Sequence, residues 1–138
     1  MTRPTLIVMA REPALGQVKS RLAARVGPAA ALQTYRELLG RTLALVAGFP
    51  EVDRLLCVTG EPPAGSPSLR APRDGFRVIE QQGADLGERM RQALEVGLLG
   101  GGPAVIVGTD CPVLSGPYLS SAFAALARVP AVLGPAED

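Results

Sequence analysis

The fold is decided by residues 5–22, which read TLIVMAREPALGQVKSRL. The first part, Thr5–Ala10, is a continuous apolar run between Pro4 and Arg11. Such a run is typical of a strand that is buried on both faces, as in a parallel sheet. A short loop containing Gly16 follows, and apolar residues at spacings of four then predict a helix over residues 17–26. The stretch therefore predicts a strand–loop–helix unit of an α/β protein.

The rest of the chain continues this alternation of strands and helices. Helices are predicted over residues 28–47, 85–99 and 115–128, the last two capped by Asp85 and Ser115. In the 85–99 helix, Leu86 is assigned to the buried face. Strands are predicted over residues 54–59, 76–80 and 103–107, and a fifth is expected to begin at 131–133. Residues 61–75 hold four prolines and predict a surface loop.

This order of elements predicts a Rossmann-like, mainly parallel sheet with helices on both faces, a three-layer α/β/α arrangement. A chain of 138 residues fits a single domain, residues 1–138. No run approaches the length of a membrane span, and the apolar stretch at the N-terminus is too short for a signal peptide. We therefore expect a cytoplasmic protein that makes no membrane contact.

Composition restricts the possible chemistry. The chain has no histidine, which excludes Ser–His–Asp and Cys–His catalysis and zinc sites that use His. Its two cysteines, Cys57 and Cys111, do not form a CxxC motif and are interpreted as reduced, mostly buried thiols. Any reaction must therefore use carboxylates, Lys or Arg, backbone groups, or a metal ion held by oxygen ligands.

Charge is distributed unevenly along the chain. Residues 1–41 carry seven Lys or Arg and two Glu, whereas the remainder is acidic, so that the whole chain has a net charge of only +1. A local positive field of this kind suits an anionic small molecule. Nucleic-acid binding usually requires a more basic chain with more aromatic residues than the 4% found here, so we expect no nucleic-acid partner. Lys19 is the only lysine, which suggests a position where a compact charge is needed.

Ligands of parallel α/β sheets bind at the carboxyl ends of the strands, so the segments after each strand are the candidates. The segment after the first strand lacks both the Walker pattern GxxxxGK[ST] and the pattern GxGxxG. It still combines Arg11, Lys19 and Arg21 with a helix N-terminus expected near Gln17, which would favour an anion. The alternative is a solvated basic helix.

Two further segments carry polar groups at the same predicted edge. Asp110 follows the fourth strand and could hold Mg²⁺ or Mn²⁺, or could instead form an Asx-turn before Pro112. Gln81–Leu86 could contact a base and a ribose, or could be only a loop and a helix cap. The terminal pair Glu137 and Asp138 adds a second acidic cluster, although terminal acids are usually just solvated.

Four stretches in order, MAREPALGQVKSRL, QGADLGERM, VGTDCP and GPAED, resemble a known family. They are similar to the small bacterial glycosyltransferase-like family of the nucleotide-diphospho-sugar transferase superfamily. Relatives of that family include the guanylyltransferases of deazaflavin-cofactor and molybdenum-cofactor synthesis. The resemblance covers essentially the whole chain and implies a GT-A type fold with Mg²⁺ or Mn²⁺ as cofactor.

The resemblance also implies roles for individual residues. Arg11, Lys19 and Arg21 would face the nucleotide phosphates, and Asp110 would bind the metal. Asp138 would be a second acid that helps the metal or the reacting group, and it is the candidate catalytic residue. The remaining implied nucleotide-binding residues are Ala10 and Gly16 in the first motif and Gln82, Gly83 and Asp85 in the second.

This sequence departs from the family pattern after its last motif. In the family, further strands and helices follow, whereas this sequence ends at Asp138, so we expect the acceptor half to be missing and the sheet to be incomplete at its C-terminal side. An uncovered fifth strand could pair with another chain and form a homodimer.

The expected function is that of a metal-dependent transferase which takes a nucleotide sugar or a nucleoside triphosphate. Glycosyl and nucleotidyl transfer both remain open. The alternatives are a non-catalytic nucleotide-binding or assembly module, and a plain α/β protein without a nucleotide site.

Overall fold

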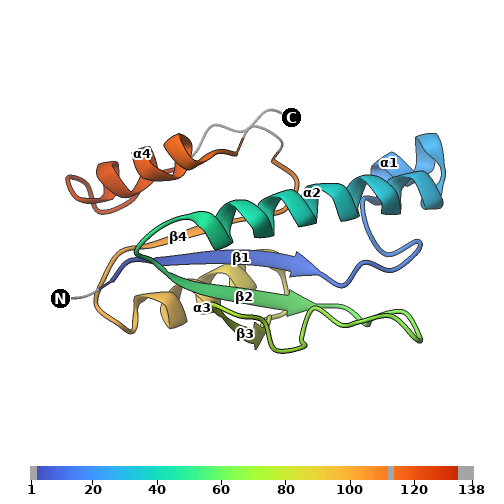
Figure 1. Cartoon of the computed structure of the whole chain (residues 1–138), viewed down its shortest axis with the longest axis horizontal. Coiled ribbons are helices and arrows are strands. Elements are labelled where there is room, and N and C mark those ends of the chain that lie inside the picture. The colour runs from blue at the N-terminus through green and yellow to red at the C-terminus, as the bar shows by residue number, and fades with distance from the viewer. Residues whose placement is uncertain (1–2, 112–113, 134–138) are drawn as a thin grey trace.

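The computed structural model of the chain describes residues 3–111 and 114–133 and contains a parallel sheet (Figure 1). Within the described residues the sheet has four strands, β1 (Thr5–Arg11), β2 (Asp53–Thr59), β3 (Phe76–Glu80) and β4 (Ala104–Val107). Their order is β3-β2-β1-β4, and every neighbouring pair is parallel. The central strand β1 therefore pairs on both sides, with Thr5 opposite Asp53 of β2 and opposite Ala104 of β4. This confirms the predicted Rossmann-like parallel sheet.

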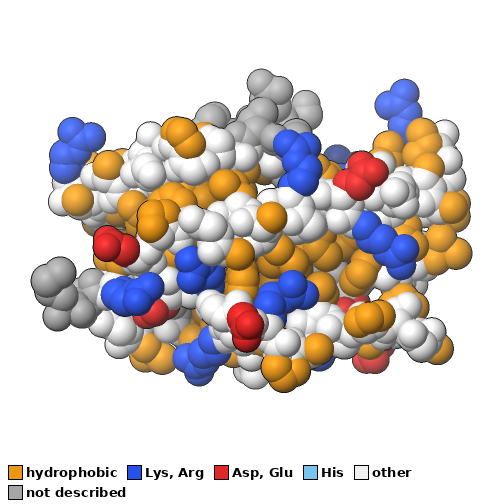
Figure 2. Space-filling view, in the orientation of Figure 1, with side chains coloured by type: hydrophobic (Ala, Val, Ile, Leu, Met, Phe, Trp, Pro, Cys, Tyr) orange, Lys and Arg blue, Asp and Glu red, His pale blue; other side chains and the backbone are white. Residues whose placement is uncertain are grey.

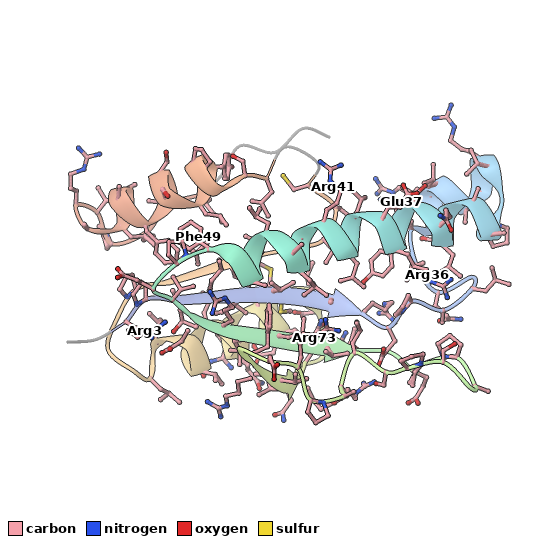
Figure 3. All side chains as sticks on the ribbon, in the orientation of Figure 1. Arg3, Arg36, Glu37, Arg41, Phe49 and Arg73 are labelled. Carbon is pink, nitrogen blue, oxygen red and sulfur yellow. The ribbon has the colours of Figure 1, made fainter. Side chains whose placement is uncertain are left out.

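Helices cover both faces of the sheet, as Figure 1 shows. The helices α2 (Pro28–Gly48) and α4 (Gly116–Leu126) lie on one face, and α3 (Leu86–Leu98) lies on the other. The rings of Phe49, at the end of α2, and Phe123 of α4 are 5.9 Å apart between centroids (Figure 3). A short helix, α1 (Ser20–Val26), precedes α2 and buries none of its residues. No helix in the described residues is both long enough and apolar enough to cross a membrane.

The alternation of side chains along β1 divides the core into two layers. Leu6, Val8 and Ala10 belong to the larger cluster, with the inner stripe of α2 and with Leu119 of α4. Ile7 belongs to the cluster on the other face, together with Cys57 and with Ala93 of α3. Leu6, Ile7 and Val8 are completely buried, as predicted for a strand enclosed on both faces.

The two predicted helix caps are confirmed. The Asp85 carboxylate accepts a hydrogen bond of 2.8 Å from the Glu88 backbone N–H, and the Ser115 hydroxyl oxygen accepts one of 3.2 Å from the Tyr118 N–H. Each cap satisfies one of the N–H groups that a helix start leaves without a partner. The start of α3 at the sheet edge is thereby fixed.

Two secondary-structure predictions are wrong. The first helix begins at Ser20 rather than Gln17, because Gly16 and Lys19 adopt positive φ angles of 76° and 48° that interrupt the helix. The expected fifth strand is absent from residues 131–133, where Leu133 is 96% exposed. The rest of the expected strand lies outside the described residues.

Two predictions of burial are also wrong. Leu86 is 65% exposed, because it lies in the first turn of α3, beyond the part of the helix that packs on the sheet. Cys111 is exposed, because it follows β4 in a loop outside the sheet. Cys57 is buried as predicted, and its burial raises the pKa of its thiol to about 11.

A buried carboxylate ties the proline-rich loop to the sheet. Glu12, the first residue after β1, is completely buried and accepts hydrogen bonds from the Ser68 hydroxyl (2.5 Å), the Leu69 backbone N–H (2.8 Å) and the Arg70 guanidinium (2.8 Å). Arg70 also binds Glu80 at the end of β3, with 2.5 Å between Nε and Oε2. These bonds satisfy the Glu12 charge, which would otherwise be very costly to bury. The network therefore holds the loop from residue 61 to 75 against the carboxyl ends of β1 and β3.

We expect the substitution Arg70→Gln to destabilise the fold by about 1–3 kcal/mol, because it leaves the buried Glu12 carboxylate without its cation. Chemical denaturation of the variant and the wild type at pH 7 measures this loss. The matched control is Arg73→Gln in the same loop (Figure 3), since the side chain of Arg73 makes none of these bonds. Equal losses in the two variants would contradict the assigned role of Arg70.

The same network predicts a pH dependence. The hydrogen bond from Arg70 lowers the pKa of Glu80 below its ordinary value of 4.5. A carboxyl whose pKa is lower in the folded state stabilises the fold above its unfolded pKa, and this contribution is lost as the pH falls through the folded pKa. The stability difference between wild type and Arg70→Gln should therefore shrink below about pH 4.5.

Candidate functional site

A cleft of about 530 Å³ opens at the carboxyl ends of the strands. It lies where the order of the sheet reverses, because the chain leaves β1 towards α2 on one face and reaches β4 from α3 on the other. Such reversal points are where parallel α/β sheets bind their ligands. The lining comes from the strand ends and from the loops that follow them, and includes Ala10, Arg11, Lys19, Tyr35, Gln81, Asp85, Arg89, Thr109 and Asp110.

An ion pair crosses the cleft between the loops that follow β1 and β4. Lys19 Nζ lies 3.2 Å from Asp110 Oδ1. The Lys19 side chain is 19% exposed and that of Asp110 is 70% exposed, so the ammonium is largely enclosed while the carboxylate stays open to solvent. The only lysine of the chain therefore partners the acid that was predicted as a metal ligand.

Lys19 reaches the cleft from the turn that immediately precedes α1. Its backbone occupies the left-handed position before α1, with φ 48° and ψ 53°, and its side chain forms no cap. The predicted helix start near Gln17 is therefore corrected to Ser20, and the contact between Lys19 and a phosphate stays a prediction. Arg21, one residue inside α1, is exposed and does not line the cleft.

Tyr35 of α2 fixes the end of β1 at the floor of the cleft. Its hydroxyl accepts a 2.9 Å hydrogen bond from the Arg11 backbone N–H and donates one of 2.6 Å to the Arg11 carbonyl. Burial raises the pKa of Tyr35 above 10.0, and the hydrogen bonds with Arg11 and with the Thr109 side chain oppose this rise. The Tyr35 hydroxyl is therefore a neutral group that connects α2 to the end of β1.

The sequence interpretation placed Tyr35 only on the inner stripe of α2. A buried tyrosine among leucines carries a hydroxyl that needs a hydrogen-bond partner. This requirement could have identified Tyr35 as a residue that contacts the strand ends.

Of the two adjacent glutamines, Gln81 lines the cleft. The Gln81 side-chain amide donates hydrogen bonds of 3.1 Å to the carbonyls of Ala10 and Cys57, so it bridges the ends of β1 and β2. Gln82 is exposed and does not line the cleft. Successive residues of an extended chain point to opposite sides, so Gln81 and Gln82 cannot both face the cleft, and the role of Gln82 in nucleotide binding stays a prediction.

Gly83 supports the cleft from outside its lining. It has a φ of 139°, and a Cβ atom built on it would lie 2.9 Å from the Arg89 backbone nitrogen and 2.7 Å from Glu88 Cγ. Because no side chain fits here, the backbone of residue 83 can approach the first turn of α3, and its carbonyl accepts a 3.1 Å hydrogen bond from Arg89 Nε. Gly83 therefore positions Arg89, which the sequence interpretation did not single out.

The structure brings five of the predicted site residues into one cleft, namely Ala10, Arg11, Lys19, Asp85 and Asp110. Gly16 forms a turn outside it, and Arg21, Gln82 and Gly83 also lie outside its lining. Asp138 lies outside the described residues. Of the seven cations in residues 1–41, only Arg11 and Lys19 reach the cleft. On the face drawn in Figure 2, Lys and Arg side chains are spread among acidic ones rather than gathered in one tract.

Comparisons with known proteins agree with this architecture. A family model described as "Uncharacterized protein conserved in bacteria (DUF2064)" matches residues 42–138. A crystal structure from Desulfovibrio desulfuricans G20, of a protein provisionally described as a nucleotide-diphospho-sugar transferase, superposes with a TM-score of 0.74 at 25% identity. The match covers 93% of this chain, and the chain spans 56% of the length of that structure. No curated protein matches the sequence significantly.

We expect Gly83→Ala to destabilise the protein by about 1–3 kcal/mol and to displace Arg89, because the added Cβ overlaps the backbone of the first α3 turn. Thermal unfolding measures the loss. Gly87→Ala, in the adjoining first turn of α3, is the control, since a Cβ there meets only Asp85 Oδ1 at an ordinary 3.5 Å. A Gly83→Ala variant as stable as Gly87→Ala would disprove the assigned packing.

Proposed function

The chain belongs to the DUF2064 family, and we propose that it is a transferase whose cleft binds an activated nucleotide, either a nucleotide sugar or a nucleoside triphosphate. The observation that carries this proposal is the cross-cleft pair of Lys19 and Asp110 at the point where the sheet order reverses. The fold shared with the protein from Desulfovibrio desulfuricans G20 that is provisionally described as a nucleotide-diphospho-sugar transferase supports it.

The cationic side chains of the cleft suit a diphosphate. Arg11 lines it from the end of β1, Lys19 from the loop that follows β1, and Arg89 from α3. In both glycosyl and nucleotidyl transfer, negative charge grows on a phosphate group as the bond to it breaks. Fixed cations that face this charge lower the barrier because they need no reorganisation. The chain would therefore contribute mainly by binding and orienting the phosphates.

The exposed carboxylate of Asp110 is a suitable ligand for a divalent cation that binds together with the nucleotide. Mg²⁺ keeps several waters and is commonly held by one or two carboxylates together with substrate phosphates. Asp110 supplies one open carboxylate, and the part of the chain that the structure describes contains no cluster of three acidic or cysteine ligands. We propose that Asp110 holds Mg²⁺ or Mn²⁺, with Asp138 as second acid and catalytic candidate. The bound ion would supply Lewis-acid polarisation of a phosphate oxygen.

The ion pair gives Lys19 and Asp110 a consistent pair of roles. Without a ligand, each charge compensates the other across the cleft. When a nucleotide binds, the Lys19 ammonium can turn to the phosphates and leave the Asp110 carboxylate to the cation. The enclosed position of Lys19 keeps the ammonium close to both partners during this exchange.

A thermal-shift panel of GTP, CTP and UDP-glucose, each with and without Mn²⁺, tests this function. We expect a nucleotide to raise the melting temperature, and the Mn²⁺-dependent part of the rise to vanish in Asp110→Ala, because a ligand that binds only the folded state stabilises it. The control is Asp74→Ala, an exposed acid of the proline-rich loop outside the cleft.

Loss of the metal effect in both variants, or in neither, would contradict the role of Asp110. If no nucleotide raises the melting temperature, the alternative of a plain α/β protein without a nucleotide site is favoured. Stabilisation without turnover would favour a binding or assembly module. Turnover that releases pyrophosphate would identify nucleotidyl transfer.

A second prediction concerns Lys19 in the absence of nucleotide. Lys19→Gln removes the cation that competes for Asp110, so Mn²⁺ alone should bind about threefold to tenfold more tightly, whereas nucleotide affinity should fall. Titration of Mn²⁺ followed by electron paramagnetic resonance measures the first effect. Arg25→Gln, which removes an exposed cation of α1 outside the cleft, is the control. Unchanged Mn²⁺ affinity in Lys19→Gln would refute the exchange of partners.

A further inference from the structure

Arg89 is a cation of the cleft lining whose individual role in binding a ligand has so far been grouped with those of Arg11 and Lys19. It lies in the first turn of α3, is half-buried, and contributes to the cleft lining. We propose that Arg89 binds an anionic group of the ligand, a phosphate or a carboxylate, that Lys19 does not hold. The proposal rests on the proposed function for the identity of the ligand, but the site itself can be tested with a simple anion.

The position of the Arg89 guanidinium is set before any ligand binds. Nε donates to the Gly83 carbonyl at 3.1 Å, an approach that requires the missing side chain at residue 83. The Asp85 cap fixes the start of α3, and the Arg89 backbone N–H donates to the Asp85 carbonyl at 3.0 Å. A guanidinium held at Nε retains its two terminal nitrogens, which can bind a phosphate or carboxylate in a bidentate manner.

The charges around Arg89 leave it without an acidic partner among the described residues. Asp85, the nearest acid in sequence on the cleft, uses its carboxylate to accept from the Glu88 N–H. Asp110, the other acid of the lining, pairs with Lys19. Arg91, two positions further along the same helix, shows the contrast, because it forms ion pairs with both Glu88 and Glu95. An anionic group of a ligand in the cleft would therefore meet a guanidinium that no acidic side chain of the described residues neutralises.

Arg89 and Lys19 reach the cleft from different layers of the fold. Arg89 comes from α3, on the face of the sheet opposite to α2, and Lys19 comes from the loop that joins β1 to α1. A ligand that contacts both must cross the cleft. Two chemical groups could reach Arg89: a phosphate of the nucleotide itself, or an acidic group on the sugar that the nucleotide carries.

Isothermal titration calorimetry of wild type, Arg89→Gln, Arg89→Lys and Arg91→Gln tests the proposal. The probes are uridine, inorganic pyrophosphate, UDP, GDP, UDP-glucose and UDP-glucuronate. We expect Arg89→Gln to weaken binding of anionic probes at least about tenfold, and Arg89→Lys to restore only part of this loss. Arg91→Gln should bind within about twofold of wild type, because exposed charges outside a site contribute little.

The pattern of losses identifies the bound group. A loss shared by pyrophosphate, UDP and GDP assigns Arg89 to a phosphate, whereas a loss confined to UDP-glucuronate assigns it to a carboxylate on the sugar. A variant Arg89→Gln that melts at a lower temperature but binds every anionic probe like the wild type would overturn the proposal and leave Arg89 a structural tie to Gly83.

The titrations distinguish a failure of the Arg89 proposal from a failure of the proposed function. If the wild type binds pyrophosphate but no nucleotide, the proposed function is wrong, and the pyrophosphate titration still decides the role of Arg89. If the wild type binds no anionic probe at all, both are wrong.

Discussion

Burial of β1 on both faces, with a paired strand on each side, is the constraint from which the site follows. Leu6, Ile7 and Val8 are completely enclosed, and a shift of one residue would exchange the two faces of the strand. The strand therefore has one register, and its first polar residues must emerge at the carboxyl edge of the sheet. There Arg11 lines the cleft, while Glu12 is buried and anchors the proline-rich loop.

The features that were predicted correctly depend on signals that are local in sequence. An uninterrupted apolar run identified β1, and the spacing from Asp85 to Glu88 and from Ser115 to Pro117 identified two helix starts. The features that were missed depend on contacts between distant segments. The choice between Gln81 and Gln82 depends on which side chain meets the carbonyls of two other strands, and no local pattern contains that information.

Charge counted along the sequence was a poor guide to charge in space. The basic character of residues 1–41 predicted a positive field, yet most of its cations lie outside the cleft, and Arg3 pairs instead with Asp53. Arg89 comes from the acidic remainder of the chain, and Gly83 is what brings it to the cleft. Backbone geometry thus determines which charges act together more than composition does.

The pair of Lys19 and Asp110 joins positions 91 residues apart in sequence. Strand β4 reaches its place beside β1 only after α2, β2, β3 and α3 have been traversed. Closing a loop of this length costs conformational entropy before the contacts between its ends can form. Folding rates accordingly fall as the mean sequence separation of contacts rises. The cleft therefore cannot be complete until β4 has paired with β1, so the Lys19–Asp110 ion pair reports that the two central strands have joined.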